Sequence, residues 1–316
     1  MVVTPSPIKI IDGIPFFSED RYWGKAPKED LEQAIAVIEE QGWDAFKKRF
    51  KDRFDATFEE NRADWRFPIP LTKHSVVLDA GAGMGRISIP LARVAGKVVS
   101  VDQSFLRMKF LKKRAELEEL GNIETYVGDL LDLPFPKESF DLIVMNGLLE
   151  WIGATDRCSD PREAQIASLK ICKDLLKPGG YLYIGIENRV ALTYLYALDH
   201  SGLRFTSYLP RVLTDAYMRL RKGKRYDTYT YTKKGYEKLL DDAGLTKVDF
   251  YLVYPGYNCP RITIPYQRLD LLNYVIRALL PENTWRRRVA RQLAGIRPLL
   301  ALYRHVFFSF NIIIQK

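Results

Sequence analysis

Three closely spaced glycines and an acidic residue follow apolar segments in the first third of this 316-residue chain. Residues 75–80 run directly into Gly81, Gly83 and Gly85, and the next apolar segment ends in Asp102. An apolar strand, a glycine turn, a helix and a second strand that ends in a carboxylate are the parts of a site for an adenosine-containing ligand. The sequence therefore predicts that such a ligand binds near residue 80.

The residue after the turn narrows the choice of ligand. Position 86 is Arg86, where the dinucleotide pattern requires its third glycine. This displacement disfavours a pyrophosphate cofactor and favours S-adenosylmethionine. In that interpretation Asp79 holds the ammonium group of the methionine, whose carboxylate lies near the turn and the following helix N-terminus. Asp102, with Gln103 beside it, accepts hydrogen bonds from the ribose hydroxyls.

Polar residues also follow the later apolar segments. Asp129 is placed to reach the adenine amino group, with Leu130 against the ring, and Asn146 ends a fourth segment and faces the reacting end. Asp129 alone could simply cap a turn. Five such features in order, each at a strand end, indicate a site more strongly than any one of them.

Apolar strands alternating with amphipathic helices predict an α/β fold with a doubly wound, mostly parallel sheet. We expect strands at 75–80, 97–102, 123–128, 140–146, 181–187, 247–254 and 307–314, and helices at 28–60 (interrupted at Gly42), 84–95, 105–120, 162–176 and 233–243.

Residues 75–188 resemble a class I S-adenosylmethionine-dependent methyltransferase. The resemblance rests on the runs 77–85 and 140–146, on Asp102, on Gly128-Asp129 and on Leu-Lys-Pro-Gly-Gly at 176–180. It implies S-adenosylmethionine as cofactor and a Rossmann-like sheet of seven strands, the last antiparallel and inserted beside the sixth. Residues 1–70 would then form a helical N-terminal extension, and 71–316 the methyltransferase domain with inserts at about 189–231 and 257–305.

The three cysteines, Cys158, Cys172 and Cys259, lie far apart with no Cys-x-x-Cys pair or Cys/His cluster. We therefore expect no disulfide partners, no metal site and a reducing, cytoplasmic location. The N-terminus lacks a signal pattern. The sequence also has no run of 18 uninterrupted apolar residues, which is the length that could span a membrane.

The net charge of +9 is concentrated in the two inserts. Residues 203–235 hold nine basic and two acidic side chains, and seven basic side chains follow Glu282 with no further acid. Arginine beside tyrosine suits phosphorylated, glycan or lipid-linked anionic acceptors, and equally RNA. The second insert could be a membrane-surface element, for which a packed helical lid is the simpler interpretation.

Few residues could take a proton from a methyl acceptor. His200 follows the fifth strand and Glu187 ends it, so both are candidate catalytic residues, although each could instead anchor a loop. Glu150 and Trp151 could shape the methyl pocket.

The sequence predicts methyl transfer from S-adenosylmethionine, to an oxygen of a small-molecule, glycan or lipid-linked anionic acceptor. The alternatives are an RNA methyltransferase, a non-catalytic cofactor-binding partner protein and, at the level of the fold, an NAD-dependent oxidoreductase.

Overall fold

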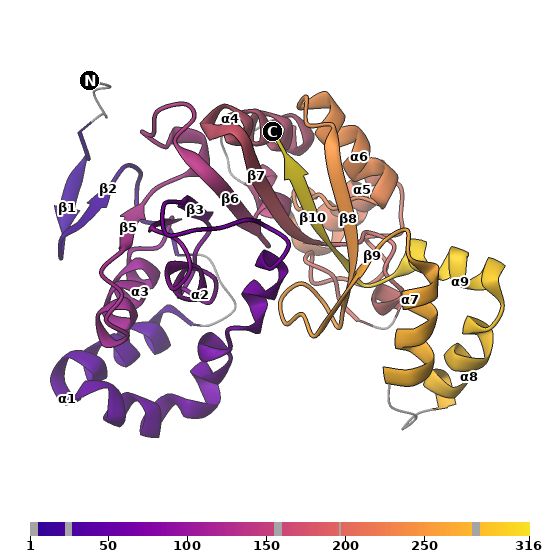
Figure 1. Ribbon diagram of the computed structural model, residues 1–316, viewed down its shortest axis with the longest axis horizontal. Helices are drawn as coiled ribbons and strands as arrows, with labels where there is room; N and C mark the ends of the chain where they lie inside the picture. Colours follow the sequence, from indigo (N-terminus) through magenta and orange to yellow (C-terminus); the bar gives the residue numbers. More distant parts are fainter. Residues whose placement is uncertain (1–5, 23–26, 155–159, 196, 280–284) are drawn as a thin grey trace. The chain divides into compact units, whose positions relative to one another are not determined.

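The computed structural model describes residues 6–22, 27–154, 160–195, 197–279 and 285–316 (Figure 1). Cys158 therefore lies outside the described residues. The chain forms two compact units, one of residues 1–146, 170–183 and 315–316 and the other of 147–169 and 184–314. The domain boundary expected at residue 70 stays a prediction.

The first unit is built on parallel strands. Its strands are β1 (Lys9–Ile11), β2 (Ile14–Phe16), β3 (Val76–Ala80), β4 (Lys97–Asp102), β5 (Ile123–Val127), β6 (Phe140–Asn146) and the first part of β7 (Leu176–Glu187). They follow the order β1-β2-β5-β4-β3-β6-β7. Strand β3 pairs in parallel with β4 and β6, and β4 with β5. The side chains of β3, β4 and β6 are almost all buried, as expected for parallel strands covered on both faces.

The helical extension packs on the helix that follows β4. The helical segments are α1 (Lys28–Phe54), η1 (Asp55–Phe58), η2 (Asn61–Arg66), α2 (Ser88–Ala92), α3 (Phe105–Leu117) and η3 (Leu130–Asp132). Gly42 interrupts α1 as predicted, with a φ of 81°. Phe46, Phe50 and Phe54 of α1 bury their rings with Phe110 of α3. This aromatic cluster fixes the chain that leads into η2.

The helix expected from residue 84 begins four residues later, at Ser88, and has only five residues. Gly81, Gly83 and Gly85 have φ angles of 73°, 56° and 84°, which lie in the left-handed region and cannot continue into a right-handed helix. A Cβ at Gly85 would lie 2.2 Å from Cδ1 of the buried Leu111, so that position also requires the absence of a side chain.

The second unit continues from β7 with the order β7-β10-β8-β9. Its strands are β8 (Lys247–Tyr254), β9 (Ile262–Pro265) and β10 (Ser309–Gln315), and β8 and β9 are antiparallel. Strand β10 runs antiparallel to β7, because Asn188 donates to the carbonyl of Phe308 while Lys316 donates to that of Gly180. The predicted seven strands are β3–β8 and β10. The last of them lies beside β8 as predicted, and the mixed, mostly parallel α/β fold is confirmed.

Three strands, β1, β2 and β9, were not predicted. The first two form a hairpin closed by Asp12 and Gly13, whose φ angles of 51° and 71° fit a type I′ turn. An Asp-Gly pair between isoleucines is a hairpin signal that could have been read from the sequence.

Strand β7 begins at Leu176, before the predicted start at residue 181, because Gly179 donates to the carbonyl of Lys316.

Further helices lie both between the later strands and within the two inserts. The remaining helical segments are α4 (Pro161–Leu175), η4 (Leu149–Ala154), η5 (Leu192–Leu195), α5 (Arg211–Lys222), α6 (Lys233–Asp242), α7 (Leu269–Tyr274), a π-turn (Val275–Leu279), α8 (Trp285–Ala294), α9 (Arg297–Tyr303) and η7 (Arg304–Val306). Val289, Leu293, Leu299 and Leu302 on α8 and α9 are exposed. None of the helices in the described ranges combines the length and the apolarity that crossing a membrane requires.

Replacing Gly85 tests the packing of the turn. We expect Gly85→Ala to lower the free energy of unfolding by about 2–5 kcal/mol, because a left-handed backbone and an overpacked Leu111 both penalise a methyl group. Urea denaturation measures this loss. Gly121→Ala is the control, since its φ is not positive and a Cβ there meets nothing within 4 Å. Equal stability of the two variants would contradict the account.

Candidate functional site

Asp102 joins the glycine turn to the end of β4. Its Oδ2 accepts a hydrogen bond from the Gly83 amide at 3.0 Å, and its Oδ1 accepts one from the Ser104 amide at 2.9 Å. The register that pairs Ala80 with Val101 brings the carboxyl ends of β3 and β4 to one edge, which makes this contact possible. Arg107 Nη1 also lies 3.6 Å from Oδ2 as an ion pair, beyond hydrogen-bond distance, so the Asp102 carboxylate can still accept hydrogen bonds from a ligand.

The backbone donors of the turn are largely used within the protein. The amides of Gly81 and Ala82 donate to the carbonyl of Val101, and that of Gly85 donates to the carbonyl of Ala82. A Cβ at Gly83 would meet nothing within 4 Å. These glycines therefore offer a ligand open space more than hydrogen-bond donors.

Asp79 is a buried carboxylate at the end of β3. Ser88 Oγ donates to its Oδ2 at 2.6 Å, and Ser100 Oγ donates to Ser88 Oγ at 2.9 Å. Burial raises the pKa of Asp79 to about 6, although the Ser88 hydrogen bond and the charge of Arg62 oppose the rise. Near neutral pH this side chain can bind a cationic group.

The residues after β4 and β5 also meet. Gln103 Nε2 donates to Asp129 Oδ2 at 2.7 Å, and the Leu131 amide donates to Asp129 Oδ1 at 3.0 Å. Leu130 is buried beside them. The structure thus brings together the residues expected at the ribose and those expected at the adenine.

Asn146, which ends β6, contacts a segment that the sequence analysis did not single out. When the Asn146 amide is oriented so that its nitrogen and its oxygen both have hydrogen-bond partners, Nδ2 donates to the Tyr183 hydroxyl at 3.1 Å. Its Oδ1 then accepts from Arg62 Nε and Nη2 at 2.6 Å each. The ring of Trp65 stacks on Tyr183 with centroids 3.5 Å apart. Arg62 stands among other charged residues, so no sequence signal distinguishes it.

Arg62 provides a positive charge near Asp79, whereas the sequence had suggested the N-terminus of the helix after the turn as the positive end. The five-residue α2 begins only at Ser88, which corrects the expectation of a helix that begins at residue 84 directly on the turn. The Arg62 guanidinium lies close enough to Asp79 to lower its pKa. The first unit thus places a cation and a carboxylate together, as the amino and carboxylate groups of an amino acid require.

The second unit holds the other candidate residues, His200 and Glu187. His200 Nε2 lies 3.0 Å from Glu187 Oε2 and 4.0 Å from Oε1 of Glu150. Glu150 is fully buried, and the other two are mostly buried. These three donor atoms lie within 4.8 Å of one another, so they could hold a metal ion. The structure therefore joins both predicted catalytic residues to Glu150.

Burial and mutual charge shift the pKa values of this cluster. Burial, together with the neighbouring Glu187, raises the pKa of Glu150 to about 8. Burial alone would lower the pKa of His200, but the adjacent carboxylates of Glu187 and Glu150 outweigh it and raise that pKa to about 9.

Aromatic side chains hold the cluster in place. The Tyr257 hydroxyl donates to Glu150 Oε1 at 3.2 Å, and a Cβ at Gly147 would lie 2.8 Å from that hydroxyl. The Trp151 ring meets the His200 ring edge-on, with centroids 5.2 Å apart.

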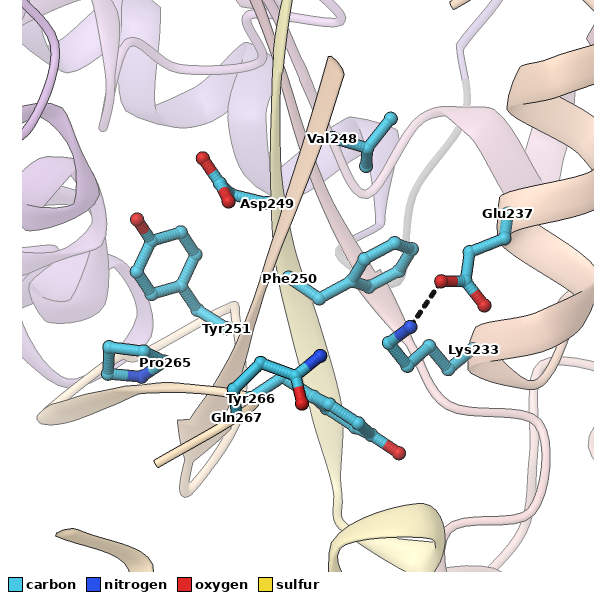
Figure 2. A pocket seen from close by; sticks show the side chains of 9 residues that line it. All are labelled: Lys233, Glu237, Val248, Asp249, Phe250, Tyr251, Pro265, Tyr266 and Gln267. Atoms are coloured by element: carbon cyan, nitrogen blue, oxygen red, sulfur yellow. Dashed lines mark hydrogen bonds and ion pairs between the residues drawn. The ribbon is translucent and has the colours of Figure 1, made fainter. Parts of the chain in front are cut away.

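A pocket of about 160 Å³ elsewhere in the second unit contains none of these residues. Lys233 and Glu237 of α6, Phe250 of β8 and Tyr266 are among its lining residues (Figure 2). Lys233 pairs with Glu237 and lies over the rings of Phe250 and Tyr266, so its charge is already satisfied. This volume is below the 300–1,000 Å³ typical of ligand pockets, and we assign it no ligand.

Part of the chain is similar to known methyltransferases. Residues 78–184 match the family described as "Methyltransferase domain". A ubiquinone biosynthesis O-methyltransferase of Coxiella burnetii is 31% identical over 169 residues, which cover 54% of this chain and 66% of that protein. Phosphoethanolamine N-methyltransferase 1 of Caenorhabditis elegans is 32% identical over 136 residues, 39% of this chain and 28% of that protein. The chain thus matches just under two thirds of the first relative's length.

One solved structure supports the fold. Phosphoethanolamine N-methyltransferase 2 of Haemonchus contortus, in complex with phosphomonomethylethanolamine and S-adenosylhomocysteine, is similar with a TM-score of 0.50 and 17% identity. The similarity covers 88% of this chain and 58% of that one, and it shows a shared fold.

The pKa of Asp79 predicts a pH dependence of ligand binding. An ammonium group binds the ionised carboxylate, so the affinity for S-adenosylhomocysteine should fall by up to about tenfold per pH unit below pH 6. Calorimetric titrations between pH 5 and 7.5 measure this dependence. Asp79→Asn should bind weakly at every pH, with the dependence removed. A constant affinity in the unmodified protein would show that Asp79 does not hold the ammonium group.

Proposed function

We propose that this chain, in which residues 78–184 form a methyltransferase domain of the S-adenosylmethionine-dependent class, methylates an oxygen of a small anionic acceptor. The observation that carries the proposal is the Asp102 carboxylate, held on the glycine turn with lone pairs left for a ribose. Asp79 and Arg62 provide opposite charges for the two ends of a methionine group. The fixed Asp129 and the buried Leu130 suit an adenine.

His200 and Glu187 are the proposed catalytic residues, contacting the acceptor oxygen. In the sequence, Glu187 follows Tyr183 by four residues, and Glu150 follows Asn146 by four. In the reaction the acceptor oxygen forms a bond to the methyl carbon as the carbon–sulfur bond breaks. S-adenosylhomocysteine leaves, and a hydroxyl acceptor also loses its proton. Positioning supplies much of the rate of such a displacement.

The anionic character of the acceptor is supported by two arginines in the second unit. Arg211 lies 3.6 Å from the Tyr229 ring centroid, and its buried Nη1 has no hydrogen-bond partner. Burial and the charge of Arg211 lower the pKa of Arg189. Over the described ranges neither guanidinium forms an ion pair with a carboxylate. Two neighbouring arginines without a counter-ion favour a phosphate or carboxylate ligand.

The named relatives are consistent with a small acceptor. Their names describe O-methylation in ubiquinone biosynthesis and N-methylation of phosphoethanolamine. We favour an oxygen acceptor because the Glu187 carboxylate, 3.0 Å from His200, suits an oxygen that must lose a proton. A glycan or lipid-linked acceptor fits the same chemistry. The exposed apolar residues of α8 and α9, together with the arginines of that insert, would permit peripheral membrane contact.

An RNA methyltransferase is the main alternative, since basic and aromatic residues also bind RNA. Steep salt dependence of RNA binding would favour it. A non-catalytic cofactor-binding partner is the second alternative, and the absence of methyl transfer to any acceptor would favour it.

A transfer assay tests the proposal. Purified protein and labelled S-adenosylmethionine are incubated with fractions of small anionic metabolites, glycan precursors, lipids and RNA, and the product that gains label is identified. We expect label in an anionic small-molecule or lipid-linked fraction. Asp102→Ala should weaken cofactor binding by about 1–3 kcal/mol and lower transfer at limiting cofactor. Glu116→Gln, on an exposed residue of α3, is the control. Label confined to RNA would contradict the proposal.

A further inference from the structure

The cluster of Glu150, Glu187 and His200 is unusual in its hydrogen bonding. Glu150 is fully buried, yet its Oε2 has no hydrogen-bond partner. Glu187 Oε2 and His200 Nε2 lie 3.0 Å apart, which is an ion pair when the imidazole is protonated, and neither has a hydrogen bond to any other group. Buried polar atoms normally have a partner, and the Glu150 Oε2 atom beside this pair has none, which calls for a further ligand.

A divalent cation would be such a partner. Donor atoms that bind one ion at about 2.0–2.2 Å lie about 3–4.3 Å from one another. The His200 Nε2 atom lies 3.0 Å from Glu187 Oε2 and 4.0 Å from Glu150 Oε1, which is within that range. Two carboxylates and a neutral imidazole carry two negative charges, so a divalent ion would leave the buried cluster neutral.

The surroundings also suit a metal centre. The Tyr257 hydroxyl donates to Glu150 Oε1 and fixes that carboxylate, as groups around metal ligands commonly do. The charged groups with the largest effect on His200 are Glu187, Glu150 and Asp199, and all three are carboxylates that would favour a bound cation.

We propose that Glu150, Glu187 and His200 bind a divalent transition-metal ion. One imidazole with two carboxylates favours Zn²⁺ or Mn²⁺ over Ca²⁺, which prefers all-oxygen sites. Three protein ligands leave coordination positions open. The binding stands alone, but the role of the ion rests on the proposed function. With the ion bound, His200 and Glu187 would act on the acceptor through the metal instead of contacting it directly, and an acceptor oxygen at an open position would lose its proton to water more readily.

Metal binding is tested on the full chain after dialysis against a chelator. Titration with Zn²⁺ by calorimetry and with Mn²⁺ by electron paramagnetic resonance should each show one strong site. The Mn²⁺ signal should show coupling to an imidazole nitrogen. Glu150→Gln and His200→Gln should each weaken binding at least tenfold, and His200→Gln should remove the nitrogen coupling. His305→Gln is the matched control, since His305 bonds to Tyr266 and lies outside the cluster.

The outcomes separate the metal site from the proposed function. Affinity for S-adenosylhomocysteine should be unchanged in Glu150→Gln, which shows that this variant is folded. No strong site, or equal binding by the unmodified protein and both cluster variants, would overturn the inference. Methyl transfer that persists in the metal-free protein, beside a confirmed site, would overturn only the role given to the ion. A confirmed site without any transfer would instead contradict the proposed function.

Discussion

The carboxylate of Asp102 at the end of β4 accepts a hydrogen bond from the glycine turn after β3, and the other candidate polar groups of the first unit follow the ends of the neighbouring strands. This hydrogen bond requires two parallel strands in a fixed register and a backbone at Gly83 that reaches φ of 56°. Because the turn closes on Asp102, its glycine amides are used internally. We therefore propose that side chains, those of Asp79 and Arg62, supply the charges for a zwitterionic ligand.

The buried acids of the chain are stabilised in different ways. Asp102 is held by backbone amides, and Asp79 by a serine network with a pKa of about 6. Glu150 has one tyrosine hydroxyl and an oxygen with no partner. A buried carboxylate without sufficient partners is costly, so a protein keeps one where a ligand or a proton compensates for it. This contrast is one reason why we propose a ligand for the cluster of the second unit.

Much of the fold follows from local pattern. Strands β4, β6 and β8 begin and end at the residues predicted, because continuous apolar runs are bounded by charged or turn residues. The start of α2 was wrong because three left-handed glycines delay the helix, and the start of β7 was wrong because its pairing with Lys316 is invisible in the local sequence. In the site, Asp102 and Gln103 could be predicted from strand ends. Arg62, Trp65 and Tyr257 could not, since they come from distant segments.

The central claim is that the turn at 81–85 and Asp102 form a site for S-adenosylmethionine and not for a dinucleotide. Calorimetric titration of the same protein sample with S-adenosylhomocysteine and with NAD tests it directly. The account predicts one bound S-adenosylhomocysteine per chain and no detectable binding of NAD. Tight binding of NAD with none of S-adenosylhomocysteine would contradict it.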